Sequence, residues 1–384
     1  MNFSLSSVLK SASALGAALL LGCGSNDGRK ELEAGQSAYE LRDLKRAEKL
    51  FGESLACAPQ DVDRILYLAR VKLDLGELAA ARDLVTQAAS LADGDADVAM
   101  LESQIAWHAK DYKTAAEGFS ALAGNAQLSA DIRSQALAGL GVVEMTCNNP
   151  HLARVAFLRA IRLNRRNAAA WYHLGLLYRD GFGYLETALE QFEIFVRLEA
   201  SASPRVQKVQ RAIIPALKES VSRALSERPG ASKRDSAACA KALAKAQTAW
   251  KKESYKVARQ AYQEAFQADP LSYPAALGLA KSWTKTDATK AGQGKALDAY
   301  KSACLLRPSA VSTFLETGAL ASRLGFYAQA VEVYSRAVAA SPTSLEALDG
   351  LIRTLRKVGN RASVAKAYQD YRDSLAQAKT AKKR

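Results

Sequence analysis

Small and apolar residues recur along the chain with a period of about 34 residues. In most units an Ala is followed four residues later by an aromatic or apolar residue, then three residues later by a small one, and often five later by Pro. The most regular examples are Ala258–Tyr262–Ala265–Pro270, Ala296–Tyr300–Ala303–Pro308 and Ala330–Tyr334–Ala337–Pro342. Spacings of three and four place these residues on one helical face. The pattern predicts an amphipathic helix in each unit.

A second apolar face lies about a dozen residues upstream of the first and predicts a second helix. Its clearest examples are Trp171–Leu174–Gly175–Tyr178 and Phe314–Gly318. Turn signals at Gly76, Gly325 and Gly359 separate the two faces. Small Ala and Gly residues allow two antiparallel helices to approach closely, while Phe and Tyr fill the space toward the next unit. Each unit is therefore predicted to be a helix-turn-helix.

This pattern resembles the tetratricopeptide repeat family over nearly the whole chain after residue 27. The resemblance implies an all-α fold, a right-handed α-solenoid of about nine helix-turn-helix repeats. The expected repeats are 28–61, 62–95, 96–129, 134–167, 168–203, 239–272, 273–310, 311–344 and 345–378. Two of them carry insertions before the second helix, one extra residue within 180–184 and about four within 286–294.

The repeat register breaks between Ser201 and Ser236. A helical stretch is expected from Pro204 to about Glu227, with a kink at Pro215, followed by a loop over 228–235. The predicted organisation is a signal peptide at 1–22, a tether at 23–27, an amino-terminal repeat block at 28–203, a connecting helix and loop at 204–238, a carboxy-terminal repeat block at 239–378 and a basic tail at 379–384.

The amino-terminal segment resembles a bacterial lipoprotein signal. Ser11–Leu21 is apolar but too short to span a bilayer, and Leu20-Leu21-Gly22-Cys23 resembles the lipobox. The resemblance implies cleavage before Cys23 and a covalent lipid on its sulfur. Gly24 is not the Asp associated with inner-membrane retention, so we expect a lipid-anchored protein of the outer membrane facing the periplasm. An ordinary signal peptide or an amphipathic first helix is the alternative.

Charge divides the chain into two unlike parts. The net charge is +14, and residues 204–384 hold 32 Lys and Arg against 14 Asp and Glu, or +18. Residues 1–203 hold 21 against 25, or −4. A basic surface attracts nucleic acid, anionic lipid, acidic peptide or anionic cell-wall polymer, although it can also be a solvated face that aids solubility.

Motifs for catalysis or metal binding are absent from the sequence. The three histidines fall in three different units without a His-Glu-x-x-His pattern. Gly292–Lys295 resembles a phosphate-binding loop, but Thr289 replaces the first Gly and Ala296 replaces the hydroxyl residue, so an inter-helix loop is expected. We predict that the chain is not an enzyme and needs no cofactor or metal beyond the lipid on Cys23.

The remaining cysteines lie far apart along the expected solenoid. They are predicted to be small core residues rather than partners in intramolecular disulfides. These residues are Cys57, Cys147, Cys239 and Cys304.

The family resemblance also implies a binding groove. In this family the first helix of each repeat lines the concave surface, with positions two, five, nine, twelve and thirteen pointing inward. The principal residues predicted for the groove are Arg70, Trp107, Tyr172, Arg179, Trp250, Lys281, Lys285, Arg353 and Arg356. The same positions also hold Gln104, His108, Gln247, Lys251, Arg323 and Lys357. The Lys/Asn clamp for a peptide carboxy-terminus is not reproduced.

These features predict a non-catalytic, lipid-anchored scaffold. Its groove would bind partner proteins with acidic segments, in an outer-membrane, pilus, secretion or cell-wall assembly. Nucleic acid is not expected because the protein is exported, and no small-molecule substrate is expected. The alternative is an adaptor that docks on anionic peptidoglycan or lipid through its basic carboxy-terminal half.

Overall fold

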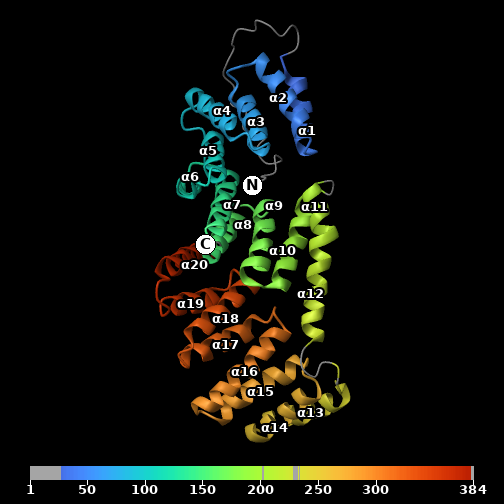
Figure 1. Cartoon of the computed structure of the whole chain (residues 1–384). Helices are drawn as coiled ribbons and strands as arrows, with labels where there is room; N and C mark the ends of the chain where they lie inside the picture. Colours follow the sequence, from blue (N-terminus) through green and yellow to red (C-terminus); the bar gives the residue numbers. More distant parts are fainter. Residues whose placement is uncertain (1–26, 201–202, 228–231, 233, 382–384) are drawn as a thin grey trace. The chain divides into compact units, whose positions relative to one another are not determined.

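The computed structural model describes residues 27–200, 203–227, 232 and 234–381, and all regular secondary structure within them is helical (Figure 1). The predicted all-α fold is therefore confirmed. The signal peptide, Cys23 with most of its tether, and the last three residues of the basic tail lie outside the described residues. No helix of the described part is long and apolar enough to cross a membrane.

The chain forms two compact units. Unit 1 comprises the residues up to Phe182 together with Glu190–Ala212, and unit 2 comprises Gly183–Leu189 together with the residues from Ile213 onward. The connecting segment expected at 204–238 is thus shared between the units.

Unit 1 begins with four antiparallel helix pairs, one in each of the first four expected repeats. Each second helix also packs against the first helix of the following pair. The helices are α1 (Arg29–Glu40), α2 (Leu44–Cys57), α3 (Val62–Asp74), α4 (Leu78–Leu91), α5 (Ala96–His108), α6 (Tyr112–Gly124), α7 (Ala130–Thr146) and α8 (Pro150–Leu163).

The fifth repeat continues with α9 (Ala168–Leu176), the π-helix η2 (Leu177–Phe182) and α10 (Leu185–Leu198). A π-helix accommodates one extra residue within a helix, so η2 absorbs the insertion expected near 180–184. Helix α11 (Pro204–Lys208) and a second π-helix, η3 (Val209–Ile213), follow. Unit 1 contains α10 from Glu190 onward and η3 up to Ala212, while the first residues of α10 and Ile213 belong to unit 2. The second π-helix comes just before Pro215, which lacks the backbone N–H that a regular helix would use.

Unit 2 contains α12 (Ile214–Ser226) and four helix pairs, which occupy the four expected carboxy-terminal repeats. Successive pairs pack through their neighbouring helices. The pairs are α13 (Ser236–Lys251) with α14 (Tyr255–Ala268), α15 (Tyr273–Thr286) with α16 (Lys290–Leu306), α17 (Val311–Arg323) with α18 (Tyr327–Ala340), and α19 (Leu345–Leu355) with α20 (Ala362–Ala381).

The interpretation of Gly292–Lys295 as an inter-helix loop is wrong. These residues lie in the first turns of α16, which begins at Lys290. The hydroxyl oxygen of Thr289 accepts a hydrogen bond from the backbone N–H of Gly292 at 3.1 Å and so caps the helix. The inserted residues therefore lengthen α16 at its amino end.

The repeated small and aromatic residues form the core. Ala258 and Ala265 are fully buried, and Tyr262 between them is 8% exposed. Asp or Ser side chains cap many of the helices; Asp95, for example, accepts hydrogen bonds from two backbone N–H groups at the start of α5. Helix formation is therefore specified locally, while burial of the Ala–aromatic face joins the helices.

A residue in the left-handed conformation follows the first helix of most pairs. Gly76 (φ +84°) and Gly325 (φ +80°) occupy this place as the sequence predicted. Gly359 also lies in the turn between the paired helices, as the sequence predicted, and the positive φ of that turn belongs to its neighbour Asn360. Other pairs place residues with a side chain in this conformation, namely Arg42, Lys110, Asn148 and Glu253.

The cysteines depart in part from the prediction. Cys239 and Cys304 are buried and free, as expected of core residues, but the free Cys147 is exposed. Cys57 is disulfide-bonded, so the expectation that no bridge forms is wrong for this residue.

Candidate partner-binding surface

Exposed cations lie on the first helices of unit 2. Lys285 is near the end of α15, Arg353 is on α19, and Arg356 directly follows α19. None of the three has a carboxylate partner within salt-bridge distance in the described part of the chain. Arg356 instead donates a hydrogen bond to the side-chain oxygen of Gln369 at 3.4 Å. These charges are therefore available to an external anion.

Lys281 differs from these residues because it is already paired. Its Nζ lies 3.1 Å from a carboxylate oxygen of Glu316 on α17. The other oxygen of Glu316 accepts a hydrogen bond from the Tyr300 hydroxyl at 2.8 Å. Burial and this bond raise the pKa of Tyr300 above its usual range. The carboxylate of Glu316 thus neutralises Lys281, which adds no uncompensated charge.

Trp250 supplies aromatic surface beside the unpaired cations. It is half-buried at the end of α13, with its ring centroid 5.0 Å from that of Tyr255 in a T-shaped arrangement. The Nζ of Lys285 lies 5.9 Å from the centroid of Tyr255. An aromatic pair next to an ammonium group could contact both the apolar and the acidic parts of a bound segment.

The cations predicted for the groove in unit 1 are engaged within the chain. Arg70 lies 3.8 Å from the carboxylate of Asp97, whose pKa is raised by burial although Arg70 opposes that shift. Arg179 forms two hydrogen bonds, of 2.6 and 2.7 Å, to the carboxylate of its neighbour Asp180. Unit 1 therefore offers much less uncompensated positive charge at the predicted positions than unit 2.

The aromatic residues predicted for unit 1 also have internal partners. The Nε1–H of Trp107 donates to the hydroxyl of Thr146 at 3.2 Å, and its ring meets that of His108. The guanidinium carbon of Arg205 lies 5.2 Å from the centroid of Tyr172, which also packs on Phe195. Sequence spacing alone could not distinguish these occupied residues from available ones.

No group of three or more His, Cys, Asp or Glu side chains among the described residues could hold a metal ion. His173 has its Nδ1 buried without a hydrogen-bond partner, and burial lowers its pKa to about 3. The rings of Phe157 and Tyr172 pack against His173, and this packing accounts for its neutral state.

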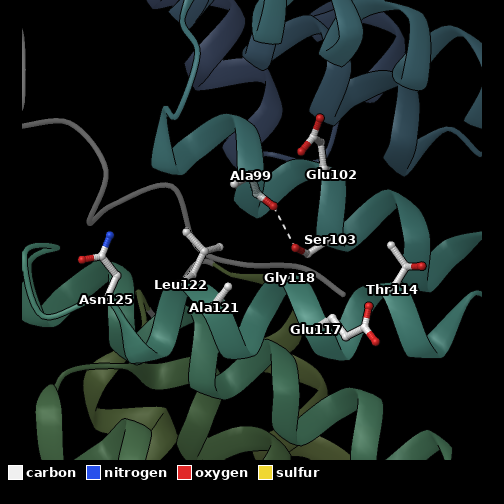
Figure 2. A pocket seen from close by; sticks show the side chains of 9 residues that line it. All are labelled: Ala99, Glu102, Ser103, Thr114, Glu117, Gly118, Ala121, Leu122 and Asn125. Carbon is white, nitrogen blue, oxygen red and sulfur yellow. Dashed lines mark hydrogen bonds between the residues drawn. The ribbon is translucent and has the colours of Figure 1, made fainter.

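A pocket of about 360 Å³ lies between α5 and α6. Figure 2 shows the hydroxyl of Ser103 turned toward the carbonyl oxygen of Ala99, to which it donates at 2.8 Å. The carboxylates of Glu102 and Glu117 also border the pocket (Figure 2). Ser103 is bonded to the backbone of its own helix, and no predicted groove residue lines the pocket. The pocket is therefore a crevice between two paired helices and not part of the basic surface.

Two segments match the family models of the tetratricopeptide repeat, residues 38–105 and residues 243–304. The first lies in unit 1 and the second in unit 2. No curated protein sequence matches the chain.

Solved structures resemble the chain in fold. The pilF protein of Pseudomonas aeruginosa is 15% identical, with a TM-score of 0.37, over 68% of this chain and 98% of that one. TTC0263, a tetratricopeptide repeat protein of Thermus thermophilus, is 18% identical, with a TM-score of 0.42, over 50% of this chain and 99% of that one. Cut9–Hcn1 of the APC/C is 14% identical, with a TM-score of 0.35, over 92% and 80% of the chains. These likenesses are too weak to bear on function.

Proposed function

We propose that this chain, two segments of which match models of the tetratricopeptide repeat, is a non-catalytic scaffold that binds partner proteins of a bacterial envelope assembly. The observation that carries the proposal is the set of exposed, unpaired cations on the first helices of unit 2, beside the aromatic surface of Trp250. The partner would present an acidic segment to this surface.

Binding would depend on preorganisation. The helix pairs hold the cations on rigid elements, so little conformational freedom of the scaffold would be lost when the segment binds. The positive charge would speed encounter with an acidic partner and would lose effect as salt is added. Contact with Trp250 would depend less on salt, because aromatic burial is not an ionic interaction.

We further propose a lipid anchor at Cys23 that holds the scaffold at the outer membrane, facing the periplasm. The support is the order of an apolar segment, Leu20-Leu21-Gly22-Cys23 and a polar tether in the sequence. Several acyl chains hold a protein firmly in a bilayer, at about 0.8 kcal/mol for each buried methylene. The envelope assembly would belong to the outer-membrane, pilus, secretion or cell-wall machinery.

The scaffold proposal is tested by affinity purification from envelope extracts. The test variant is Lys285→Glu with Arg353→Glu, and the control is Lys256→Glu with Lys290→Glu, which changes the net charge equally. Lys256 and Lys290 are exposed residues of the second helices α14 and α16. A specific protein should co-purify with the wild type and the control but not with the test variant. Equal recovery with all three proteins would refute the proposed surface.

The alternative is an adaptor that docks directly on anionic peptidoglycan or lipid. The +18 charge of residues 204–384 is the observation in its favour. In that case the purified protein should sediment with isolated sacculi or anionic vesicles without another protein, and salt should release it. The test and control variants should then lose binding equally, because net charge rather than position would matter.

A further inference from the structure

The positive charge of unit 2 is concentrated at one edge of its helix pairs. We define the turn edge as the turn within each pair, with the last four residues of the first helix and the first four of the second. It comprises residues 248–258, 283–293, 320–330 and 352–365. These segments hold two acidic residues, Glu253 and Asp287, against ten basic ones. The basic residues are Lys251, Lys252, Lys256, Lys285, Lys290, Arg323, Arg353, Arg356, Lys357 and Arg361.

The four turns lie at the same edge because of the short connections between pairs. Each connection is four residues long, so consecutive helices run antiparallel, and each second helix packs against the next first helix. The opposite edge consists of these connections with the adjoining four residues on either side, namely 265–276, 303–314 and 337–348. It holds one cation, Arg307, against Asp269 and Glu346.

The basic character of the turn edge is specific to unit 2. In the first four pairs of unit 1, the equivalent segments are 37–47, 71–81, 105–115 and 143–153, and they hold six basic and six acidic residues. Helix stability does not account for the difference. Lys256 is the second residue of α14 and Lys290 the first of α16, and a cation at the amino end of a helix opposes the helix dipole.

The cations of the turn edge are available to an external anion. All ten are exposed, and none lies within salt-bridge distance of a carboxylate among the residues that the structure describes. Elsewhere in unit 2, Arg234 pairs with Asp269 at 2.7 Å and Arg372 with Asp349 at 2.9 Å. The charge of the turn edge is therefore not used to hold the fold together.

An aromatic ring between two further cations adjoins the turn edge and links its first two turns. The ring is that of Trp283, which is half-buried near the end of α15. The guanidinium carbon of Arg259 lies 4.1 Å from the ring centroid, and Nζ of Lys295 lies 4.8 Å from it. Arg259 also donates to the hydroxyl of Thr286 at 2.9 Å. Three helices, α14, α15 and α16, thus contribute to one cationic and aromatic cluster.

The turn edge also exposes apolar side chains among its cations. Val257 on α14 is 50% exposed, and Phe326 at the start of α18 is 39% exposed. Leu305 is exposed to a similar degree, but it lies at the opposite edge, where Arg307 is the one basic residue. Exposed apolar residues within a basic surface suit a partner that has both negative charge and an apolar interior.

We propose that the turn edge of unit 2 docks on an anionic lipid bilayer. The cations contact the phosphate groups, while Val257, Phe326 and the edge of Trp283 enter the interfacial layer, where aromatic and basic side chains are favoured together. A cell-wall polymer fits less well, because it offers no apolar interior to Val257 and Phe326. Nucleic acid is disfavoured for the same reason.

This inference goes beyond the proposed scaffold. It assigns a second surface, although Lys285 and Trp250 lie where that surface meets the cations of the first helices. It also differs from an adaptor held by net charge alone, since the position of the charge now decides binding. Residues of the second helices, such as Lys256 and Lys290, belong to the turn edge only, and they separate the two surfaces experimentally.

Vesicle flotation tests the inference. The full chain carries Cys23→Ser in every sample, so that no lipid anchor contributes. It should float with vesicles of equal parts phosphatidylglycerol and phosphatidylcholine but not with phosphatidylcholine alone, and salt should weaken the binding. Failure to bind the anionic vesicles would overturn the inference.

Two charge variants test the position of the binding surface. Lys256→Glu with Lys290→Glu should weaken binding to the anionic vesicles at least about tenfold. The control, Lys241→Glu with Lys379→Glu, changes the net charge equally. Lys241 and Lys379 are exposed and lie toward the opposite edge, near the start of α13 and the end of α20. Equal weakening by both variants would show that only net charge matters and would overturn the turn edge.

Apolar variants distinguish a bilayer from a polymer. Val257→Ser with Phe326→Ser keeps the charge and should weaken vesicle binding about tenfold, because two side chains no longer enter the bilayer. Leu305→Ser at the opposite edge should leave it unchanged. Unchanged binding by the double variant, or binding to isolated sacculi in place of vesicles, would refute the lipid assignment.

The scaffold stands or falls separately. The chain with Lys256→Glu and Lys290→Glu should lose vesicle binding, yet it should still recover the partner protein from envelope extracts. Vesicle binding without recovery of any protein would refute the scaffold and leave the turn edge. Recovery of a partner without vesicle binding would refute the turn edge and leave the scaffold.

Discussion

The ring of Tyr334 occupies the space that a side chain at Gly350 would need. A Cβ atom built at Gly350 would overlap this ring, and one at Gly318 would lie 2.8 Å from it. Gly318 belongs to the same repeat as Tyr334, and Gly350 belongs to the next. The ring is 5% exposed, so these two glycines allow it to bridge the repeats.

Replacing Gly350 with Ala should destabilise unit 2 by about 1–3 kcal/mol, because the new methyl group overpacks the ring of Tyr334. The control is Gly294→Ala in α16, where a Cβ would meet no atom within 4 Å. There the better helix propensity of Ala should stabilise the protein by up to about 1 kcal/mol. Chemical denaturation measures both changes. Equal effects of the two substitutions would contradict the packing argument.

The turn residues give a second pair of substitutions. Gly325 has a φ of +80° with no atom near its absent Cβ, so Gly325→Ala should cost about 1–2 kcal/mol through backbone strain alone. Lys110 has a φ of +64° at the equivalent turn of unit 1, and Lys110→Gly should be stabilising by up to about 1 kcal/mol. Thermal unfolding measures both shifts, and destabilisation by Lys110→Gly would refute the assignment of strain.

His173 should make stability depend on pH. Burial lowers its pKa to about 3, whereas the unfolded chain binds the proton near its ordinary value of about 6.5. Below about pH 6.5 the unfolded state therefore gains protons first, so the free energy of unfolding falls as pH falls toward 3. At pH 5 the loss is up to about 2 kcal/mol. Denaturant titrations at pH 5 and pH 8 should show a smaller difference for His173→Phe than for the wild type; an unchanged difference would exclude His173 as its source.

The free cysteines should react at very different rates. Burial raises the pKa of Cys304 to about 11, and its sulfur lies 3.3 Å from the hydroxyl of Thr317. Cys147 is exposed and free. Iodoacetamide at pH 8 should therefore alkylate Cys147 at least about a hundredfold faster in the native protein, because reaction requires the thiolate. Mass mapping after a short pulse measures the ratio, and denaturant should abolish it.

The lipid anchor makes a prediction about two cysteines. Cys23→Ser should move the protein from the membrane fraction to the soluble fraction, whereas Cys147→Ser should leave it with the membrane. An unmodified amino-terminal peptide in the membrane-derived protein would rule out the anchor.

Local patterns predicted the helix pairs correctly because the information is local. Ala258, Tyr262 and Ala265 recur at helical spacing, and the same spacing puts all three in the core. The failures occurred where a local motif has two meanings. The glycines of Gly292–Lys295 suggested a loop, but Thr289 caps a helix there.

The candidate surface was less predictable. Lys281 and Lys285 look alike in the sequence, yet Glu316 from the next repeat neutralises the first and leaves the second unpaired. Tyr172 was expected in the groove, yet Arg205 from a helix outside the repeats lies over its ring. Both partners are distant in sequence, so no spacing rule connects them.

The sequence by itself determined that the chain forms paired helices, since periodicity, caps and small residues act within one or two turns. Only the tertiary structure decided which charges remain available, as between Lys281 and Lys285. That choice depends on carboxylates and rings brought in from neighbouring repeats, because Coulomb attraction and desolvation act over a few ångströms of space whatever the separation along the chain.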